Sequence, residues 1–219
     1  MSLSALAGLS LLILGESHLA ATGSLIEALH DDLVKQGAQV HSIGACGAGA
    51  QDWLAKKKVD CGGDRVGKGK AVIRGADATT FPIGELIAAD KPDVVVVIIG
   101  DTMAAYDKSA FPKTWAWQSV TALTRAISAT RTRCVWVGPP WGKAGGRYNK
   151  NDERVRLMST FLATNVAPCD YVDSLKFSKP GEWKTTDGQH FTVAGYKAWG
   201  AAITQALANT PAVKEAHAK

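Results

Sequence analysis

The sequence of 219 residues contains no apolar run of the roughly 18 residues that a membrane-spanning helix needs. The most apolar stretch near its start, residues 3–14, is interrupted by Ser4, Gly8 and Ser10, and no basic segment precedes it. We therefore expect residues 9–14 to form a buried strand, and we predict neither a membrane span nor a signal peptide within this sequence.

Cysteine is scarce, and its spacing excludes the common metal sites. None of Cys46, Cys61, Cys134 and Cys169 lies in a Cys-x-x-Cys pair, and no Cys/His spacing matches a zinc site, so we predict no metal and no cofactor. A Cys46–Cys61 bridge would close one loop, and a Cys134–Cys169 bridge would join two neighbouring strands. Such pairing indicates a periplasmic or secreted protein, whereas four reduced, buried thiols would indicate a cytoplasmic one.

Charged residues make up only 21% of the chain, and 25 basic against 20 acidic residues give a net charge of +5. Much of the basic excess lies in one segment, at Lys56, Lys57, Lys58, Arg65, Lys68, Lys70 and Arg74. This segment is either a solvated loop or a surface that attracts an acidic polymer such as an anionic glycan. No nucleic-acid-binding motif or aromatic platform accompanies the charge, so we expect no nucleic-acid partner.

Apolar runs alternate with helical patterns along the whole chain. We expect strands at residues 9–14, 39–43, 93–99, 134–137 and 171–172, and helices at residues 24–36, 115–129, 152–165 and 192–208. The run of six β-branched residues at 94–99 indicates a strand that is buried on both faces, as in a parallel sheet covered by helices. The pattern predicts an α/β protein, a three-layer α/β/α sandwich with a five-stranded, mainly parallel sheet.

Residues 1–219 are expected to form a single domain, with two segments outside the regular pattern. Residues 56–80 are glycine-rich and basic, and we interpret them as an insertion that forms a hairpin or an ordered loop. Residues 210–219 are interpreted as a frayed tail.

Three short segments carry candidate catalytic residues: Gly15-Glu16-Ser17-His18, Gly100-Asp101-Thr102 and Asp187-Gly188-Gln189-His190. Each follows a predicted strand, and active sites of α/β folds gather at the carboxyl ends of strands. A serine hydroxyl becomes a nucleophile when a base takes its proton, and that base needs an orienting acid. Ser17, Asp187 and His190 supply these three groups, although Ser17 alone would also serve as a helix N-cap.

The segments resemble the sequence blocks of the SGNH (GDSL-type) hydrolases. Gly15-Glu16-Ser17 resembles block one, Gly44-Ala45-Cys46-Gly47 block two, Gly100-Asp101 block three, and Asp187-Gly188-Gln189-His190 block five. The resemblance extends in order and spacing from residue 9 to about residue 208. It implies the flavodoxin-like SGNH fold and a serine hydrolase that needs no cofactor.

The resemblance also implies a role for each matching residue. Ser17 would be the nucleophile, His190 the base, and Asp187 the acid that orients the imidazole. The backbone N–H groups of Ser17 and Gly47 would form an oxyanion hole together with the side chain at position 101. The family carries asparagine there, and this chain carries Asp101, which cannot donate a hydrogen bond when ionised. Either Asp101 is protonated, or Thr102 donates in its place, or the site is weak or specialised.

Three further residues are predicted at the rim of the site: His18, Trp141 and Trp183. Tryptophans on loops either stack on sugar rings or anchor the loops themselves. The resulting hypothesis is a serine esterase that removes short acyl groups, above all acetyl, from an ester substrate such as a carbohydrate. The alternatives are an O-acetyltransferase acting on a polysaccharide or peptidoglycan with the same triad, and a glycan-binding module with a decayed active site.

Overall fold

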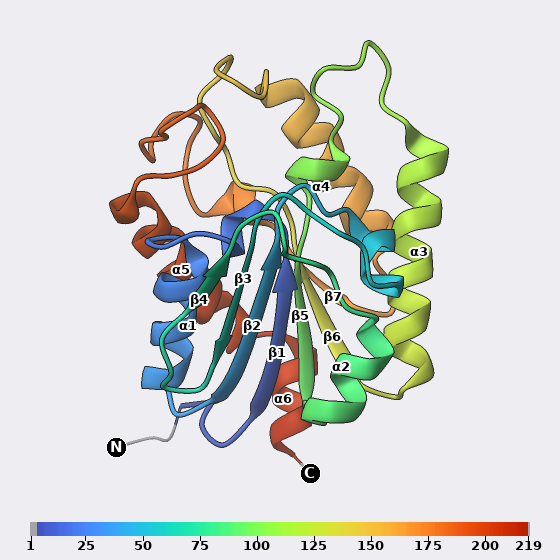
Figure 1. Ribbon diagram of the computed structural model, residues 1–219, viewed down its shortest axis with the longest axis vertical. Coiled ribbons are helices and arrows are strands. Elements are labelled where there is room, and N and C mark those ends of the chain that lie inside the picture. The colour runs from blue at the N-terminus through green and yellow to red at the C-terminus, as the bar shows by residue number, and fades with distance from the viewer. Residues whose placement is uncertain (1–3, 219) are drawn as a thin grey trace.

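The computed structural model of the protein describes residues 4–218, in which seven strands form one sheet between two layers of helices (Figure 1). The strand order is β4-β3-β2-β1-β5-β6-β7. The strands are β1 (Ser10–Gly15), β2 (Gln39–Ala45), β3 (Gly62–Val66), β4 (Val72–Arg74), β5 (Val94–Ile98), β6 (Arg133–Val137) and β7 (Asp170–Val172). The predicted α/β sandwich is confirmed, but the prediction of five strands is wrong.

The two additional strands come from the segment predicted as a basic insertion, residues 56–80. β3 pairs antiparallel with β2, and β4 pairs antiparallel with β3, whereas β1, β2, β5, β6 and β7 pair in parallel. The segment is therefore a hairpin that extends the sheet. The apolar pattern used to find the other strands does not identify these two. Gly62 and Gly63 of β3 have no side chain to bury, and all three residues of β4 are exposed.

The helices cover both faces of the sheet. They are α1 (Leu25–Lys35), α2 (Ile83–Asp90), α3 (Lys113–Ala129), α4 (Asp152–Asn165), α5 (Val193–Leu207) and α6 (Pro211–His217). Helices α2, α3 and α4 pack on the face to which Leu12 and Leu14 of β1 contribute. Helices α1, α5 and α6 pack on the face to which Leu11 and Ile13 contribute. Side chains of a strand alternate between its faces, so a strand covered on both sides is apolar throughout.

The C-terminal segment is a packed helix and not a frayed tail. Pro211 occupies the first turn of α6, where the missing N–H costs nothing, and the Thr210 side chain accepts a hydrogen bond from the Val213 N–H. Ala212, Val213 and Ala216 are buried against the sheet. A segment of seven residues is too short for its apolar pattern to indicate a helix from the sequence. The helix forms because its apolar side packs into the core.

All four cysteines are paired, as Cys46–Cys61 and Cys134–Cys169. The two predicted disulfides are therefore confirmed. The first ties the segment after β2 to the start of β3, and the second ties β6 to the segment before β7. Within residues 4–218, none of the helices combines the length and the hydrophobicity that crossing a bilayer requires.

Candidate active site

The carboxyl ends of β1, β2 and β5 meet at one edge of the sheet (Figure 1). Gly15, the last residue of β1, pairs with Gly44 of β2 and Ile98 of β5, so the three strands end at the same level. A Cβ atom on Gly44 would lie 2.4 Å from the backbone of Leu19, so glycine lets the short 3₁₀ helix η1 (Ser17–Leu19) pack directly on β2. This contact fixes the backbone that carries Ser17.

Ser17, His190 and Asp187 form a continuous chain of hydrogen bonds. The Ser17 hydroxyl lies 2.7 Å from His190 Nε2, and His190 Nδ1 lies 2.7 Å from Asp187 Oδ2. Asp187 Oδ1 also accepts the N–H groups of Gln189 and His190, at 3.0 and 2.8 Å. Partial burial alone would raise the pKa of Asp187, but the hydrogen bonds outweigh it and lower that pKa. An ionised Asp187 accepts the Nδ1 proton and leaves Nε2 free to take the proton of Ser17.

Ser17 and Gly47 carry the two backbone N–H groups that the family resemblance assigns to an oxyanion hole. Ser17 and Gly47 both line a cavity of about 780 Å³ at this edge of the sheet. Within residues 4–218, no protein acceptor pairs with either N–H group. Gly47 has a φ of +73°, which side chains disfavour, and nothing stands within 4 Å of the position a Cβ would take. The cavity therefore reaches the Gly47 backbone.

Asp101 is buried, ionised and fully bonded. Its Oδ2 atom accepts hydrogen bonds from Lys150 Nζ at 2.6 Å and His18 Nε2 at 2.9 Å, and its Oδ1 atom accepts one from the Tyr106 hydroxyl. Burial would raise the pKa of Asp101, but the Lys150 ammonium and the His18 hydrogen bond hold that pKa well below its usual range. Of the three alternatives for position 101, a protonated Asp101 that donates to an oxyanion does not fit these contacts.

Thr102 does not replace the missing donor either. Its hydroxyl donates to the carbonyl of Ala48 at 2.9 Å, and its N–H donates to Glu16 Oε2 at 2.8 Å. Both of its donors are thus used within the protein, and the remaining candidates for an oxyanion hole are the N–H groups of Ser17 and Gly47.

Glu16 joins the segment after β1 to the segment after β5. Its carboxylate accepts three backbone N–H groups, those of Gly100, Asp101 and Thr102, each at 2.8 Å. Burial, with a smaller contribution from the charge of Asp101, raises the pKa of Glu16 to about 7, although the three N–H groups oppose this shift. Glu16 thus holds the backbone of the segment after β5 in place directly beside Ser17.

His18 is not at the rim of the site, because its side chain is only 1% exposed. Nε2 bonds Asp101, and Nδ1 bonds the Tyr196 hydroxyl at 2.9 Å. Burial lowers the pKa of His18 to about 4, so the ring is neutral near pH 7. A neutral ring that donates to Asp101 accepts from Tyr196. His18 is thus a polar core residue behind Ser17.

The two loop tryptophans also lie away from the cavity, so their prediction as rim residues is wrong. Trp141 is 5% exposed, its Nε1 donates to the carbonyl of Leu175 at 2.9 Å, and the Arg156 guanidinium lies 4.5 Å from its ring. Trp183 packs edge-on against Phe191 with a centroid distance of 5.6 Å. Trp141 is buried and Trp183 is half-buried, so each ring anchors its loop by removing apolar surface from water.

Several cavity residues were not singled out from the sequence. They are Asp60, Ala105, Tyr106, Asp107, Arg147, Tyr148, Asn149 and Gln189. Tyr148 meets the His190 ring edge-on, with centroids 5.3 Å apart, and the Arg147 guanidinium lies 5.6 Å from the Tyr148 ring centroid. These residues come from segments that are far apart in the sequence and that meet only in the fold.

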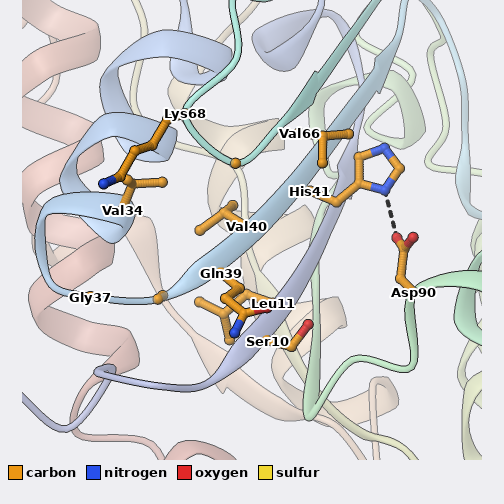
Figure 2. A pocket seen from close by; sticks show the side chains of 12 residues that line it. Ser10, Leu11, Val34, Gly37, Gln39, Val40, His41, Val66, Lys68 and Asp90 are labelled. Carbon is orange, nitrogen blue, oxygen red and sulfur yellow. Dashed lines mark hydrogen bonds and ion pairs between the residues drawn. The ribbon is translucent and has the colours of Figure 1, made fainter.

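A second cavity, of about 530 Å³, lies at the opposite ends of the strands (Figure 2). Ser10 and Gln39, the first residues of β1 and β2, line it together with His41 and Asp90. His41 bonds Asp90 and Asp64, which raise its pKa although burial opposes the shift. Among residues 4–218, no group of three or more His, Cys, Asp or Glu side chains is arranged to hold a metal ion.

Solved structures with this fold include SGNH-type esterases and lipases. A family two carbohydrate esterase from Clostridium thermocellum matches with a TM-score of 0.62 at 11% identity, covering 93% of this chain and 64% of the other. The acetyl xylan esterase AlAXEase matches with a TM-score of 0.56 at 14% identity over 90% and 98% of the two chains. A GDSL-like lipase from Bacteroides thetaiotaomicron matches with a TM-score of 0.55 at 14% identity over 90% and 86% of the two chains. The fold is therefore that of the SGNH (GDSL-type) hydrolases.

A curated relative places the chain more closely. Protein BcsX of Komagataeibacter xylinus is 45% identical over 204 residues, which are 92% of this chain and 77% of that protein. The chain belongs to the BcsX family. No protein-family model matches the sequence.

Proposed function

We propose that the protein is a serine esterase that removes short acyl groups, above all acetyl, from a carbohydrate ester through an acyl-enzyme on Ser17. The observation that carries this proposal is the hydrogen-bonded chain from Ser17 through His190 to Asp187, with 2.7 Å at each side-chain contact. It opens on a cavity of about 780 Å³, which has room for a sugar residue.

The geometry supports a two-step mechanism. His190 Nε2 takes the proton of the Ser17 hydroxyl while Ser17 Oγ attacks the acyl carbonyl carbon. The carbon–oxygen bond to the sugar then breaks, and His190 returns the proton to the leaving sugar hydroxyl. In the second step His190 takes a proton from water, the resulting hydroxide attacks the acyl-enzyme, and the proton returns to Ser17 as the carboxylic acid leaves.

The oxyanion of each tetrahedral intermediate would be held by the N–H groups of Ser17 and Gly47. Asp101 takes no direct part because its oxygens accept hydrogen bonds from Lys150, His18 and Tyr106. Its negative charge is compensated by the buried ammonium of Lys150. Asp101 is therefore not evidence for a decayed site, which favours an esterase over a glycan-binding module.

The carbohydrate substrate is supported by the cavity wall and by proteins of the same fold. Tyr106 and Tyr148 offer aromatic faces, and Arg147, Asn149 and Asp107 offer polar groups to sugar hydroxyls. Neighbours in fold include an acetyl xylan esterase, a peptidoglycan O-acetylesterase and a carbohydrate esterase in complex with cellohexaose. The two disulfides favour action in an oxidising compartment, the periplasm or the outside of the cell.

The test is hydrolysis of p-nitrophenyl acetate, p-nitrophenyl butyrate and an acetylated cello- or xylo-oligosaccharide by the wild type, Ser17→Ala and Ser109→Ala. Ser109 is exposed and serves as the matched control. We expect Ser17→Ala to lose roughly 10⁴-fold or more in kcat and to form no adduct with a serine-directed phosphonate in intact mass spectrometry. Equal turnover by wild type and Ser17→Ala would overturn the proposal.

The same experiment separates the alternative activity. In the presence of an unacetylated oligosaccharide, an esterase releases acetate, whereas an O-acetyltransferase consumes the donor and acetylates the oligosaccharide. Mass spectrometry of the oligosaccharide decides between the two.

A further inference from the structure

Lys150 is the buried end of an otherwise exposed loop. Residues 143–149 are all exposed, whereas Lys150, the next residue, is 1% exposed. Its stem runs beside Gly142, where a Cβ atom would lie 2.7 Å from Lys150 Cδ. An ammonium group is costly to bury unless it is paired, so this position requires a carboxylate.

That carboxylate is Asp101, which comes from a different part of the fold. Lys150 Nζ lies 2.6 Å from Asp101 Oδ2, and the two side chains are 1% and 0% exposed. Asp101 belongs to the short helix η3 (Asp101–Met103) after β5, and Lys150 lies just before α4. The pair therefore joins the loop of residues 142–151, here called the 142–151 loop, to the edge of the sheet beside Ser17.

The 142–151 loop also touches the acid–base segment of the triad. The Arg147 N–H donates to the carbonyl of Asp187 at 3.0 Å, and the Lys143 N–H donates to the carbonyl of Gly188 at 2.9 Å. At its tip, Tyr148 lies edge-on to the His190 ring. Movement of this loop would therefore change both the wall of the cavity and the surroundings of His190.

We propose that Lys150 is a positioning residue, whose buried contact with Asp101 fastens the 142–151 loop so that Tyr148 and Arg147 form the substrate wall beside His190. The exchange of the family's asparagine for Asp101 is thus matched by Lys150, and together they replace a neutral amide by a fastening ion pair. The effect on substrate binding rests on the proposed esterase function, whereas the fastening of the loop does not.

The experiment compares Lys150→Met, the double variant Asp101→Asn/Lys150→Met, and Lys143→Met, which makes the same change at an exposed lysine of the same loop. Three readouts are used: the urea unfolding midpoint, the rate at which trypsin cleaves between Arg147 and Tyr148, and kcat and KM for an acetylated oligosaccharide. Cleavage is followed by mass spectrometry and reports on opening of the loop independently of activity.

Removing Lys150 alone leaves a buried carboxylate without its counter-charge, so the midpoint should fall in Lys150→Met. The double variant removes both charges and should regain most of the midpoint. In both variants we expect cleavage at Arg147 to accelerate about 10-fold or more, and KM to rise about 10-fold with a smaller change in kcat. Lys143→Met should match the wild type in unfolding and in KM.

Wild-type cleavage at Arg147 and wild-type KM in the double variant would overturn the proposal, because Lys150 would then only neutralise Asp101. If Lys150→Met does not fold, the double variant carries the test. If the wild type has no esterase activity, the proposed function fails, and the cleavage rates alone still decide whether Lys150 fastens the loop.

Discussion

At the residue scale, the centre of this protein is a set of buried ionisable side chains behind Ser17. Glu16, His18 and Asp101 are each 4% exposed or less. Burial raises the pKa of Glu16 and lowers that of His18, in both cases against the effect of their hydrogen-bond partners. At Asp101 the Lys150 ammonium and the His18 hydrogen bond outweigh burial and lower the pKa. Their ionisation therefore couples the stability of the site to pH.

His18 should make the protein less stable in acid. The pKa of His18 is about 4 in the folded protein, below the ordinary value of 6.5. Between these pH values His18 is therefore protonated in the unfolded chain and neutral in the folded protein. The contribution of His18 to the free energy of unfolding should therefore fall as the pH drops from about 6.5 towards 4, by on the order of 2–3 kcal/mol. Glu16, whose pKa is raised, contributes stability that is present below about pH 4.5 and is lost as the pH rises to about 7, so it opposes the effect of His18.

The contribution of His18 is isolated by His18→Gln, whose amide can donate to Asp101 and accept from Tyr196 without titrating. Urea unfolding at pH 7 and pH 4.5 should show a smaller acid loss in His18→Gln than in the wild type, since Glu16 is present in both. His217→Gln, at an exposed position, is the control and should behave as the wild type. Equal acid losses in His18→Gln and the wild type would contradict the prediction.

At the scale of elements, the Cys46–Cys61 disulfide lies in the wall of the cavity, next to Gly47. The Cys46 N–H also donates to the Cys61 carbonyl at 2.8 Å, so this end of β2 is tied to β3 twice. Neither Cys134 nor Cys169 is among the residues that line the cavity, and their disulfide joins β6 to the segment just before β7, near the amino ends of these strands. The two bridges therefore offer a matched comparison.

Removing the first bridge, in Cys46→Ser/Cys61→Ser, should lower the free energy of unfolding by about 3 kcal/mol, the loss expected for a loop of this length. It should also lower kcat roughly 10-fold or more because the Gly47 N–H is no longer held in place. Cys134→Ala/Cys169→Ala should lose a similar amount of stability and keep its kcat. Ester hydrolysis and urea unfolding of both variants test this, and equal kcat values in the two would refute a role for the first bridge in catalysis.

The sequence predicted those elements whose apolar pattern is local. The parallel strands and the helices α1, α3, α4 and α5 follow from runs and periodicity, and their order predicted that Ser17, Asp101 and His190 lie at one edge of the sheet. The hairpin of β3 and β4 was not predicted as part of the sheet because its pairing with β2 is made by backbone groups of Gly62 and Gly63.

The site was less predictable in its polar partners and in its walls. Lys150 lies 49 residues from Asp101, and no local pattern indicates that the two side chains meet. Trp141 follows a strand, as a rim residue would, but a hydrogen bond to the Leu175 carbonyl holds its indole inside the protein. Such contacts depend on the tertiary fold, which spacing along the chain does not encode.

At the scale of the whole molecule, α6 completes the layer of helices that includes α1 and α5 (Figure 1). The Ala212 N–H donates to the carboxylate of Asp170, the first residue of β7, at 2.7 Å. Glu215 pairs with Arg133, the first residue of β6. The helix thus closes the core at the end of the sheet that is remote from Ser17.

Val213, which is 0% exposed, reports on this closure. Val213→Asp should lower the free energy of unfolding by about 3 kcal/mol or more because it buries an unpaired carboxylate. Lys214→Asp introduces an aspartate at the neighbouring, exposed position and should change the free energy of unfolding by less than about 1 kcal/mol. Thermal unfolding of both variants checks this, and equal melting temperatures would show that α6 adds nothing to the core.

The contact between Asp101 and Lys150 also bears on how relatives are recognised from sequence. A profile that scores each column separately counts Asp101 as the loss of an oxyanion-hole asparagine and gives Lys150 no weight. If the two positions changed together during evolution, homologues with aspartate after the buried strand should carry lysine at the end of the following loop, and homologues with asparagine should not. Covariation between these two columns would then mark a distinct branch of SGNH proteins.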